Sequence, residues 1–485
     1  MRKIFSHLAL STRLRKRAGE KPKQATDGTG TSRSRSRSQP KGAGHHDTIP
    51  VVDHALPPPN TLQPPQHPPK PDPAPDQDTT APTLESLPAE LRRLILARLV
   101  ASDDIGGLRA LVSASPVFFQ QYLLDRKTLL RATLKHARGI PLADAYALQT
   151  SARLYSQPPG SDPDAPCELT DPEDVRCFVD GYQALRKLPG EVILAEHCSE
   201  EDLVGMVAFY EAVAKPLAPV CAAQFLRRLK PAPEMGTLSV MEVARLLRGL
   251  YRFQIYCNLF GQGAKGRRNA PPLEFAGEQL ELFFCLFEPW EVDEIYCVYV
   301  LVRDMYGWVL DRTEVGGNGE KVGFEDWKAP LAGSKKDLRN DPVSAHRCSL
   351  LEGAALRGLV PFYRLVREDD DEKMAGMLEA YLVPGSGNIE HALGRPNQAA
   401  RRRRHPMDGD GSEAAWTRLI FYGDVENGPP LAWVIYWKGR YVNRYGDALE
   451  PSVQRWGHVF WDNKRLVKSQ GLEELLCERE VFRRW

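Results

Sequence analysis

Residue types that carry enzyme chemistry occur in this 485-residue chain, but not in the arrangements that such chemistry needs. His197-Cys198 combines a base with a nucleophile by residue type, yet adjacent residues rarely point to one site, and the sequence shows no third partner for them. The carboxylates of Glu368–Glu372 are typical of acids that begin a helix. The sequence contains no GxSxG, HExxH, P-loop or kinase motif. We therefore predict no catalytic residue, no metal site and no cofactor.

One glycine-rich segment matches a motif that binds dinucleotides in other proteins. Gly261–Gly266 matches GxGxxG, which binds a dinucleotide only where it joins a strand to the N-terminus of a helix. Here it follows an expected long helix and leads into Arg267-Arg268 and Pro271-Pro272. The pattern predicts the end of a helix and a loop.

Basic clusters raise the question of nucleic acid. The tetrad of Arg401, Arg402, Arg403 and Arg404 could act as a nuclear-import signal or a phosphate-binding patch, or it could be a solvated loop. Binding of nucleic acid normally needs basic residues on an ordered face with aromatic residues between them. The clusters lie in sequence that we expect to be disordered, and the whole chain has a net charge of only +1. We therefore do not expect nucleic acid among the partners.

Residues 1–82 have the composition of a disordered tail. The part from Met1 to Lys41 has twelve Lys or Arg against two acids, and Pro57–Pro82 contains eleven prolines. A segment this poor in apolar residues cannot offset the entropy lost on ordering. Its basic start is also how a mitochondrial presequence reads, and this alternative stays open. The chain has no uninterrupted apolar stretch of the roughly 18 residues that span a membrane, so we expect no membrane contact.

The segment after Thr83 has the pattern of short helices. Pro88 falls in a first turn, where its missing N–H costs little. Asp103-Asp104 would cap a second helix and Ser115-Pro116 a third, and the pattern then predicts a further helix from Arg126 through Leu134. Apolar residues recur at helical spacing through this segment: Leu87, Leu91, Ile95, Leu99, Leu108 and Leu111.

The start of this segment resembles the F-box signature, which places LPxEL at the beginning of a first helix and then an Ile-Leu pair. Leu87–Leu91 reads LPAEL, and Ile95-Leu96, Leu99, Asp103-Asp104 and Leu108 follow. The resemblance implies a three-helix F-box-like module over residues 83–130. Its surplus apolar residues would be covered by the Skp-type adaptor, which connects F-box proteins to a cullin scaffold. The implied contact residues are Leu87, Pro88, Leu91, Ile95, Leu96, Leu99 and Leu108.

The chain departs from the common F-box pattern after Val112. Many F-boxes continue with a Cys-Lys pair and a Trp, whereas Ser113–Phe119 reads SASPVFF here, so the contacts of the third helix are affected more than those of the first. The chain is similar in several blocks to a large set of uncharacterised fungal F-box-like proteins, and that resemblance implies no substrate. The blocks are residues 114–130, 246–261, 288–291 and 455–462.

The remainder reads as a larger, irregular helical domain over residues 131–383 and 415–485, with a disordered Arg-rich loop over residues 384–414 between the two parts. Capping boxes at Ser199–Asp202 and Ser239–Glu242 predict helix starts, and Leu350–Val366 is expected to be one helix. Leu431–Trp437 (LAWVIYW) suits a short strand or a buried helical turn. The aromatic residues of the last part could form a core or line a substrate pocket.

Nine cysteines without a CxxC pair indicate buried free thiols of an intracellular protein. We therefore expect a mainly α-helical protein of the cytoplasm or nucleus, with an F-box-like module, a larger helical domain and a disordered N-terminal tail. The expected function is that of a non-catalytic adaptor that brings an unidentified protein substrate to a cullin ubiquitin ligase. The alternative is a helical scaffold whose F-box-like segment is buried and joins no ligase.

Overall fold

A computed structural model describes residues 83–154, 172–228, 236–261, 279, 282–315, 342–382, 389–393, 419–439 and 452–483. Within these ranges the chain is mainly helical and contains no strand, which confirms the predicted fold class. The predictions made for residues 1–82 and for Arg401–Arg404 lie outside the described residues.

The longer helices are α2 (Ala89–Ala101), α3 (Ile105–Ala114), α4 (Pro116–His136), α5 (Leu142–Arg153), α6 (Pro172–Leu185), α8 (Glu200–Phe209), α9 (Lys215–Arg227), α10 (Val240–Phe260), α12 (Pro289–Val315), α13 (Pro342–Ala355), α14 (Leu359–Val366), α15 (Asp371–Tyr381) and α21 (Gly471–Arg483). The shorter elements include η1 (Leu84–Ser86), α7 (Gly190–Val192), η2 (Ile193–His197), η3 (Tyr210–Ala214), η5 (Phe284–Leu286), α16 (Ile389–Ala392), α18 (Leu431–Trp437), α19 (Ser452–Arg455), η10 (His458–Phe460) and α20 (Asn463–Lys468).

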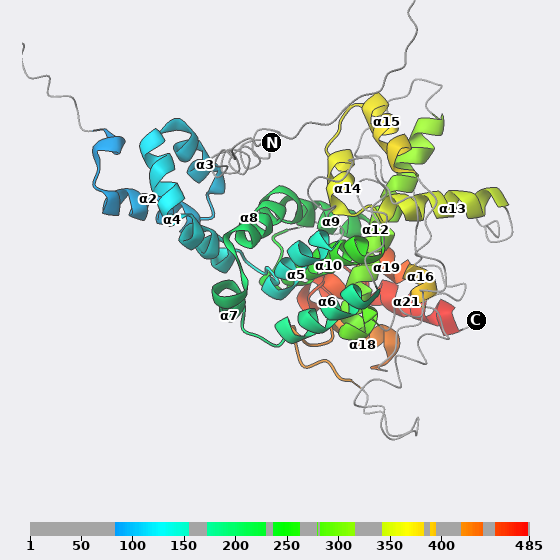
Figure 1. The fold of residues 1–485 in the computed structure, drawn as a ribbon. Coiled ribbons are helices and arrows are strands. Elements are labelled where there is room, and N and C mark those ends of the chain that lie inside the picture. Colours follow the sequence, from blue (N-terminus) through cyan, green and yellow to red (C-terminus); the bar gives the residue numbers. More distant parts are fainter. Residues whose placement is uncertain are drawn as a thin grey trace, which may run out of the picture. The chain divides into compact units, whose positions relative to one another are not determined.

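Helices α2, α3 and α4 form a small module with an apolar cluster of its own (Figure 1). The predicted caps are confirmed: the Asp104 carboxylate accepts from the Gly107 N–H at 2.7 Å, and the Ser115 hydroxyl accepts from the Phe118 N–H at 3.3 Å. The buried residues of this cluster are Leu96, Val100, Leu108, Phe118 and Leu129.

Helix α4 differs from the expectation. It is one helix of 21 residues, so the prediction of a new helix starting at Arg126 is wrong. Residues 117–136 contain neither glycine nor proline, and the backbone hydrogen bonds therefore continue without a break. As a result α4 runs across the expected module boundary at residue 130 and on into the larger body (Figure 1).

The larger body is built around α10 and α12. Helix α10 packs against both α5 and α12, and nearly all its side chains are buried, including those of Arg245, Arg248 and Arg252. Both predicted capping boxes are confirmed: Ser199 with Asp202 starts α8, and Ser239 with Glu242 starts α10. The caps thus fix where the two helices begin, and burial of apolar surface holds them together.

The C-terminal part of the chain packs onto this centre. Of the two structures left open for Leu431–Trp437, the helix is the one found, as α18. Helices α19 and η10 pack on α12, and α18 packs on α21. Trp433, Trp456 and Trp461 are buried in the main core, so these tryptophans stabilise the fold and do not line a pocket.

Two further expectations need correction. Within the supposed loop 384–414, residues 389–392 form the short helix α16, and Ile389, Ala392 and Leu393 are buried in the core. The single helix expected over Leu350–Val366 is two, α13 and α14, which meet at Gly358. That glycine is the N-cap of α14, and its φ of 90° is a non-helical backbone conformation that residues with a side chain rarely adopt.

The cysteines are less uniformly buried than expected. Cys198, Cys221, Cys257 and Cys297 are buried free thiols. Three others are exposed on the surface: Cys177, Cys348 and Cys477.

One helical stretch, Glu200–Arg227, is long and apolar enough to cross a membrane by length and composition alone. Leu203, Met206 and Phe225 of this stretch are buried in the main core. The core helices of globular proteins can have this length and composition, and we describe the stretch as a core helix.

Candidate functional site

The residues that the resemblance assigns to a partner divide into three groups. Leu91 is 45% exposed, and Pro88 is also open to solvent. Leu87, Ile95 and Leu99 are half-buried. The remaining two, Leu96 and Leu108, are 0% and 8% exposed and belong to the core of the module. In this conformation they shape the surface from beneath and do not reach a partner directly.

The structure adds exposed apolar residues to this set. Leu94 of α2 is 62% exposed and Leu124 of α4 is 80% exposed. Arg93 and Asp125, their neighbours in sequence, form an ion pair of 3.1 Å that joins the two helices. We call the exposed apolar residues of the module its apolar set, which consists of Leu84, Leu91, Leu94, Phe119, Leu123 and Leu124. The sequence signal that would have found the additional residues is that their helical phase turns them away from the buried leucines.

Short polar contacts hold the entry to α2 in place. The Arg92 guanidinium donates to the backbone carbonyls of Glu85 at 3.2 Å and Leu87 at 3.0 Å. The Ser115 hydroxyl, which also caps α4, donates to the Glu85 carboxylate. The LPAEL segment is therefore fastened to its own helix and to the start of α4, which gives Leu91 a defined orientation.

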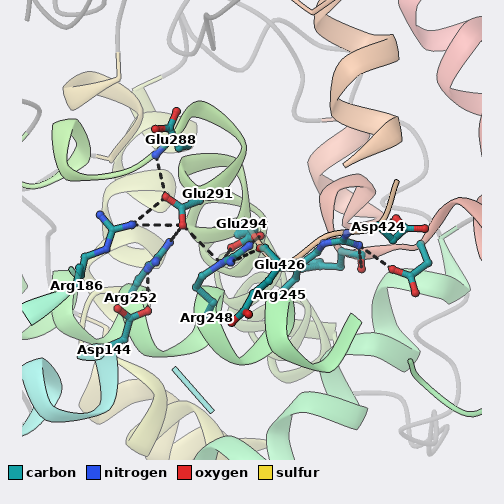
Figure 2. Close-up of polar contacts among 12 residues, drawn as sticks. Asp144, Arg186, Arg245, Arg248, Arg252, Glu288, Glu291, Glu294, Asp424 and Glu426 are labelled. Carbon is teal, nitrogen blue, oxygen red and sulfur yellow. Dashed lines mark hydrogen bonds and ion pairs between the residues drawn. The ribbon is translucent and has the colours of Figure 1, made fainter. Parts of the chain in front are cut away.

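A second polar feature lies deep in the larger body, where arginines of α10 meet carboxylates of α12 (Figure 2). The Arg252 guanidinium lies 2.8 Å from Asp144 and 2.8 Å from Glu291, and all three side chains are buried. The Tyr182 hydroxyl donates to Asp144 at 2.6 Å. The guanidinium also lies over the Phe287 ring, 4.5 Å from its centroid. Each charge is thus met by an opposite charge and a hydrogen bond.

The same network continues along α10. Arg248 donates to both carboxylate oxygens of Glu294, at 2.7 and 2.5 Å, and to the backbone carbonyl of Glu426 at 2.9 Å. Arg245 reaches Asp424 and Asp462, at 3.4 and 3.0 Å. Since Asp424, Glu426 and Asp462 come from the C-terminal part of the chain, the arginines fasten that part to the central helix (Figure 2).

Mutual pairing determines the ionisation of these groups. Burial alone would raise the pKa of Glu291, but Arg252, Arg248 and Arg186 outweigh it and hold that pKa well below its usual range. Burial alone would lower the pKa of Arg252, but Asp144 and Glu291 raise it above its ordinary value. Glu291 and Arg252 are therefore charged at neutral pH, whereas burial outweighs Arg248 and raises the pKa of Glu294. The chemistry of the network is that of an ionic connection between helices.

We did not predict this ionic network from the sequence, although the spacing of its charged residues was a signal for it. Arg245, Arg248 and Arg252 recur at spacings of three and four residues in an otherwise apolar helix, and Glu291 and Glu294 do the same. Charges on a face that must be buried indicate an ionic pairing between helices.

The structure also describes two other candidate groups from the sequence, His197-Cys198 and the start of the glycine motif at Gly261. His197 is exposed, whereas Cys198 is buried with its sulfur 3.8 Å from that of Met206. Burial, assisted by Asp202, raises the pKa of Cys198 to about 11, which disfavours the thiolate that a nucleophile needs. Helix α10 ends at Phe260 with Gly261 as its C-cap, which confirms the predicted helix end.

Glu352 of α13 is expected to make stability depend on pH. Burial, and then the nearby negative Glu390, raise the pKa of Glu352 to about 7 from an ordinary value of 4.5, while Arg303 opposes the shift. The folded protein therefore holds this proton more tightly than the unfolded chain, so its contribution is largest below pH 4.5 and is lost as pH rises to about 7. Glu352→Gln should be more stable than the wild type by about 1–3 kcal/mol at pH 8, at 1.36 kcal/mol per pKa unit less some solvent screening. The advantage should shrink towards pH 5.

Urea unfolding of both proteins at pH 5 and pH 8 measures this. Comparing the variant with the wild type at each pH cancels the titration of the other groups. An equal difference at the two pH values would show that Glu352 keeps an ordinary pKa.

Among the described residues there is no group of three or more His, Cys, Asp or Glu side chains that could hold a metal ion. No protein-family model, curated protein or solved structure matches the chain.

Proposed function

We propose that the three-helix module, Thr83–His136, is an F-box-type docking module that binds a Skp-type adaptor and through it a cullin scaffold. The larger helical domain would then bind a protein substrate, in the cytoplasm or nucleus, with a charged ubiquitin carrier brought close to the substrate's lysines. This chain would position the substrate and would supply no catalytic nucleophile. The observation that carries the proposal is the exposure of Leu91 and Leu94, at 45% and 62%, on the helix that LPAEL begins.

Covering the exposed apolar surface of α2 with a partner would lower the free energy of the complex. Leu91 and Leu94 lie three residues apart and therefore share one side of α2, while Leu96 and Val100 on the other side form the core. Leucines gathered on one exposed side of a helix favour a partner's apolar groove. Glu90 in the first turn of α2 is favourable to the helix dipole, and α2 is helical in the chain without a partner.

The test is co-purification of the full-length chain with the Skp-type adaptor. Leu91→Asp combined with Leu94→Asp should reduce that association about 100-fold or more, because each buried leucine is worth about 1.5–3 kcal/mol and 1.4 kcal/mol is a factor of ten. The core cluster is untouched, so circular dichroism of the variant should match that of the wild type.

The matched control places the same charges on exposed apolar residues of the larger body. Val467→Asp with Leu476→Asp alters side chains that are 60% and 43% exposed in α20 and α21, and the association should be unchanged. Adaptor binding that survives the Leu91 and Leu94 changes, or that the wild type lacks, would sink the proposal.

That result would favour the alternative, a non-catalytic helical scaffold. The observation on its side is that the module is packed on the body, since α4 lies against α8 and its Leu130 and Leu134 belong to the main core.

A further inference from the structure

The module and the body have separate apolar cores that α4 connects. Leu129 belongs to the cluster of the module, whereas the next residue, Leu130, belongs to the main core. Among the closely packed pairs of described elements, α4 with α8 joins the two parts, while α2 and α3 pack with each other and with α4. Apolar packing therefore holds the end of the module that α4 carries into the body, and the contact between the α2–α3 turn and the body is polar.

A polar contact is present at the far side of the module, where α2 turns into α3. The Lys215 ammonium, at the start of α9, lies 2.8 Å from the Asp103 carboxylate in that turn. On its own side Lys215 lies 3.2 Å from Glu211 and 5.6 Å from the centroid of the Tyr210 ring. Glu211 and Tyr210 thus position the ammonium before Asp103 reaches it, which reduces the entropy lost when the contact closes.

The backbone at Asp103 points to the same contact. Asp103 has φ 58°, in the left-handed region where a helix end usually has glycine. The turn is closed by the Asp103 N–H donating to Val100 and the Asp104 N–H donating to Leu99, at 3.0 and 2.9 Å. Glycine would form this turn with less strain, but only an acidic residue can also form an ion pair with Lys215.

The opposite end of the joint is held by α4 itself. The Arg131 guanidinium donates to the carbonyls of Leu194 and Ala195 in the π-helical turn η2, at 3.0 and 2.9 Å. Arg126 pairs with Glu200 at the start of α8, at 3.0 Å. These contacts lie where α4 packs on the larger body, and they hold that end of the module. That end would be the pivot if the rest of the module turned.

We propose that Asp103 and Lys215 form a charge-dependent latch that fixes the orientation of the three-helix module on the larger body. With the latch closed, α2 and α3 are held against the start of α9. With it open, the module turns about the α4 joint while its own core stays folded. The inference does not depend on what the module binds.

The latch is supported by the charge state of its lysine. Burial alone would lower the pKa of Lys215, but the hydrogen bond to Asp103 and the charge of Glu211 raise it. The ammonium is therefore charged at neutral pH, so salt and removal of the charge are the ways to open the contact.

The test measures the distance between spin labels in the full-length chain by pulsed electron resonance. Labelled unnatural amino acids at two exposed positions, Arg109 in α3 and Asp180 in α6, leave the exposed cysteines unmodified. Lys215→Met and Asp103→Asn should each raise the share of molecules outside the main distance by roughly twofold to fivefold, the range that an exposed ion pair gives. Asparagine tolerates the left-handed backbone, so Asp103→Asn removes the charge without adding strain.

The control is Lys373→Met. Lys373 also lies near two carboxylates, at 3.7 Å from Glu368 and 3.1 Å from Asp370, but within one exposed segment at α15. It should leave the distances unchanged, whereas about 1 M salt should move the wild type towards the latch variants. Asp103→Gly separates strain from charge: it should open the latch without lowering the melting temperature of the protein. Distances in Lys215→Met and Asp103→Asn that match the wild type would overturn the proposal.

Discussion

Arg252→Met is expected to lower the free energy of unfolding by about 3–5 kcal/mol, the usual cost of removing one partner from a buried ion pair. Methionine keeps the length of the side chain and most of its apolar contacts, so little of the loss comes from a cavity. What remains is the uncompensated charge of Asp144, which is 2% exposed and keeps the hydrogen bond from Tyr182, whereas Glu291 still pairs with Arg186 at 3.1 Å and with Arg248 at 3.8 Å. Urea unfolding followed by tryptophan fluorescence measures the loss.

The control for this change is Arg176→Met on the surface of α6. Arg176 pairs with Glu173 at 3.4 Å, and both side chains are largely exposed, so the variant should stay within about 0.5 kcal/mol of the wild type. Combining Arg252→Met with Asp144→Asn removes the uncompensated charge and should recover part of the lost stability. A loss below about 1 kcal/mol for Arg252→Met alone would mean that water or neighbouring side chains replace the guanidinium, contrary to its close pairing with Asp144 and Glu291 in Figure 2.

Local signals in the sequence were sufficient to predict the starts of several helices. Ser199 with Asp202 and Ser239 with Glu242 make capping boxes, and Ser115 before Pro116 caps α4. Each cap depends on residues three positions apart, so it can be recognised without knowing the rest of the fold. The error at α4 has the same origin: a helix continues when nothing stops it, and the expected break at Arg126 had no stop signal.

The partner-facing residues could be predicted only by type. Apolar residues occur on two sides of α2, Leu91 and Leu94 on one and Leu96 and Val100 on the other. A helical pattern identifies both sides but does not decide which one faces the core, because that depends on where α4 packs. The structure decides it, with Leu96 at 0% exposure and Leu94 at 62%.

The pairing of charges in the ionic network could not be predicted from the sequence for a different reason. Asp144 and Arg252 are 108 positions apart, and Arg245 and Asp462 are 217 apart. Partners this distant are brought together only by the packing of α5, α10 and the C-terminal turns, which no local pattern specifies. The sequence indicated where the charges are, but not which of them meet.

The second large effect is expected at Gly457, between α19 and η10. Its φ of 64° lies in the left-handed region, which costs an alanine about 1 kcal/mol. A Cβ there would lie 2.8 Å from atoms of the Phe225 and Phe460 rings, both fully buried and packed on each other with centroids 5.1 Å apart. Neither ring can move without disturbing the main core, and overpacking of this kind costs about 1–3 kcal/mol. Gly457→Ala should therefore lower the free energy of unfolding by about 2–4 kcal/mol.

The matched control is the same substitution where the surroundings are empty. Gly181 lies in the exposed side of α6, and a Cβ there would meet nothing within 4 Å. Because alanine is the better helix former, Gly181→Ala should raise the free energy of unfolding by about 0.5–1 kcal/mol. One chemical change thus has opposite signs at two positions, and urea unfolding of both variants measures the difference. If Gly457→Ala were as stable as the wild type, the turn that carries Trp456 and His458 into the core would have to be looser than the ring contacts around it allow.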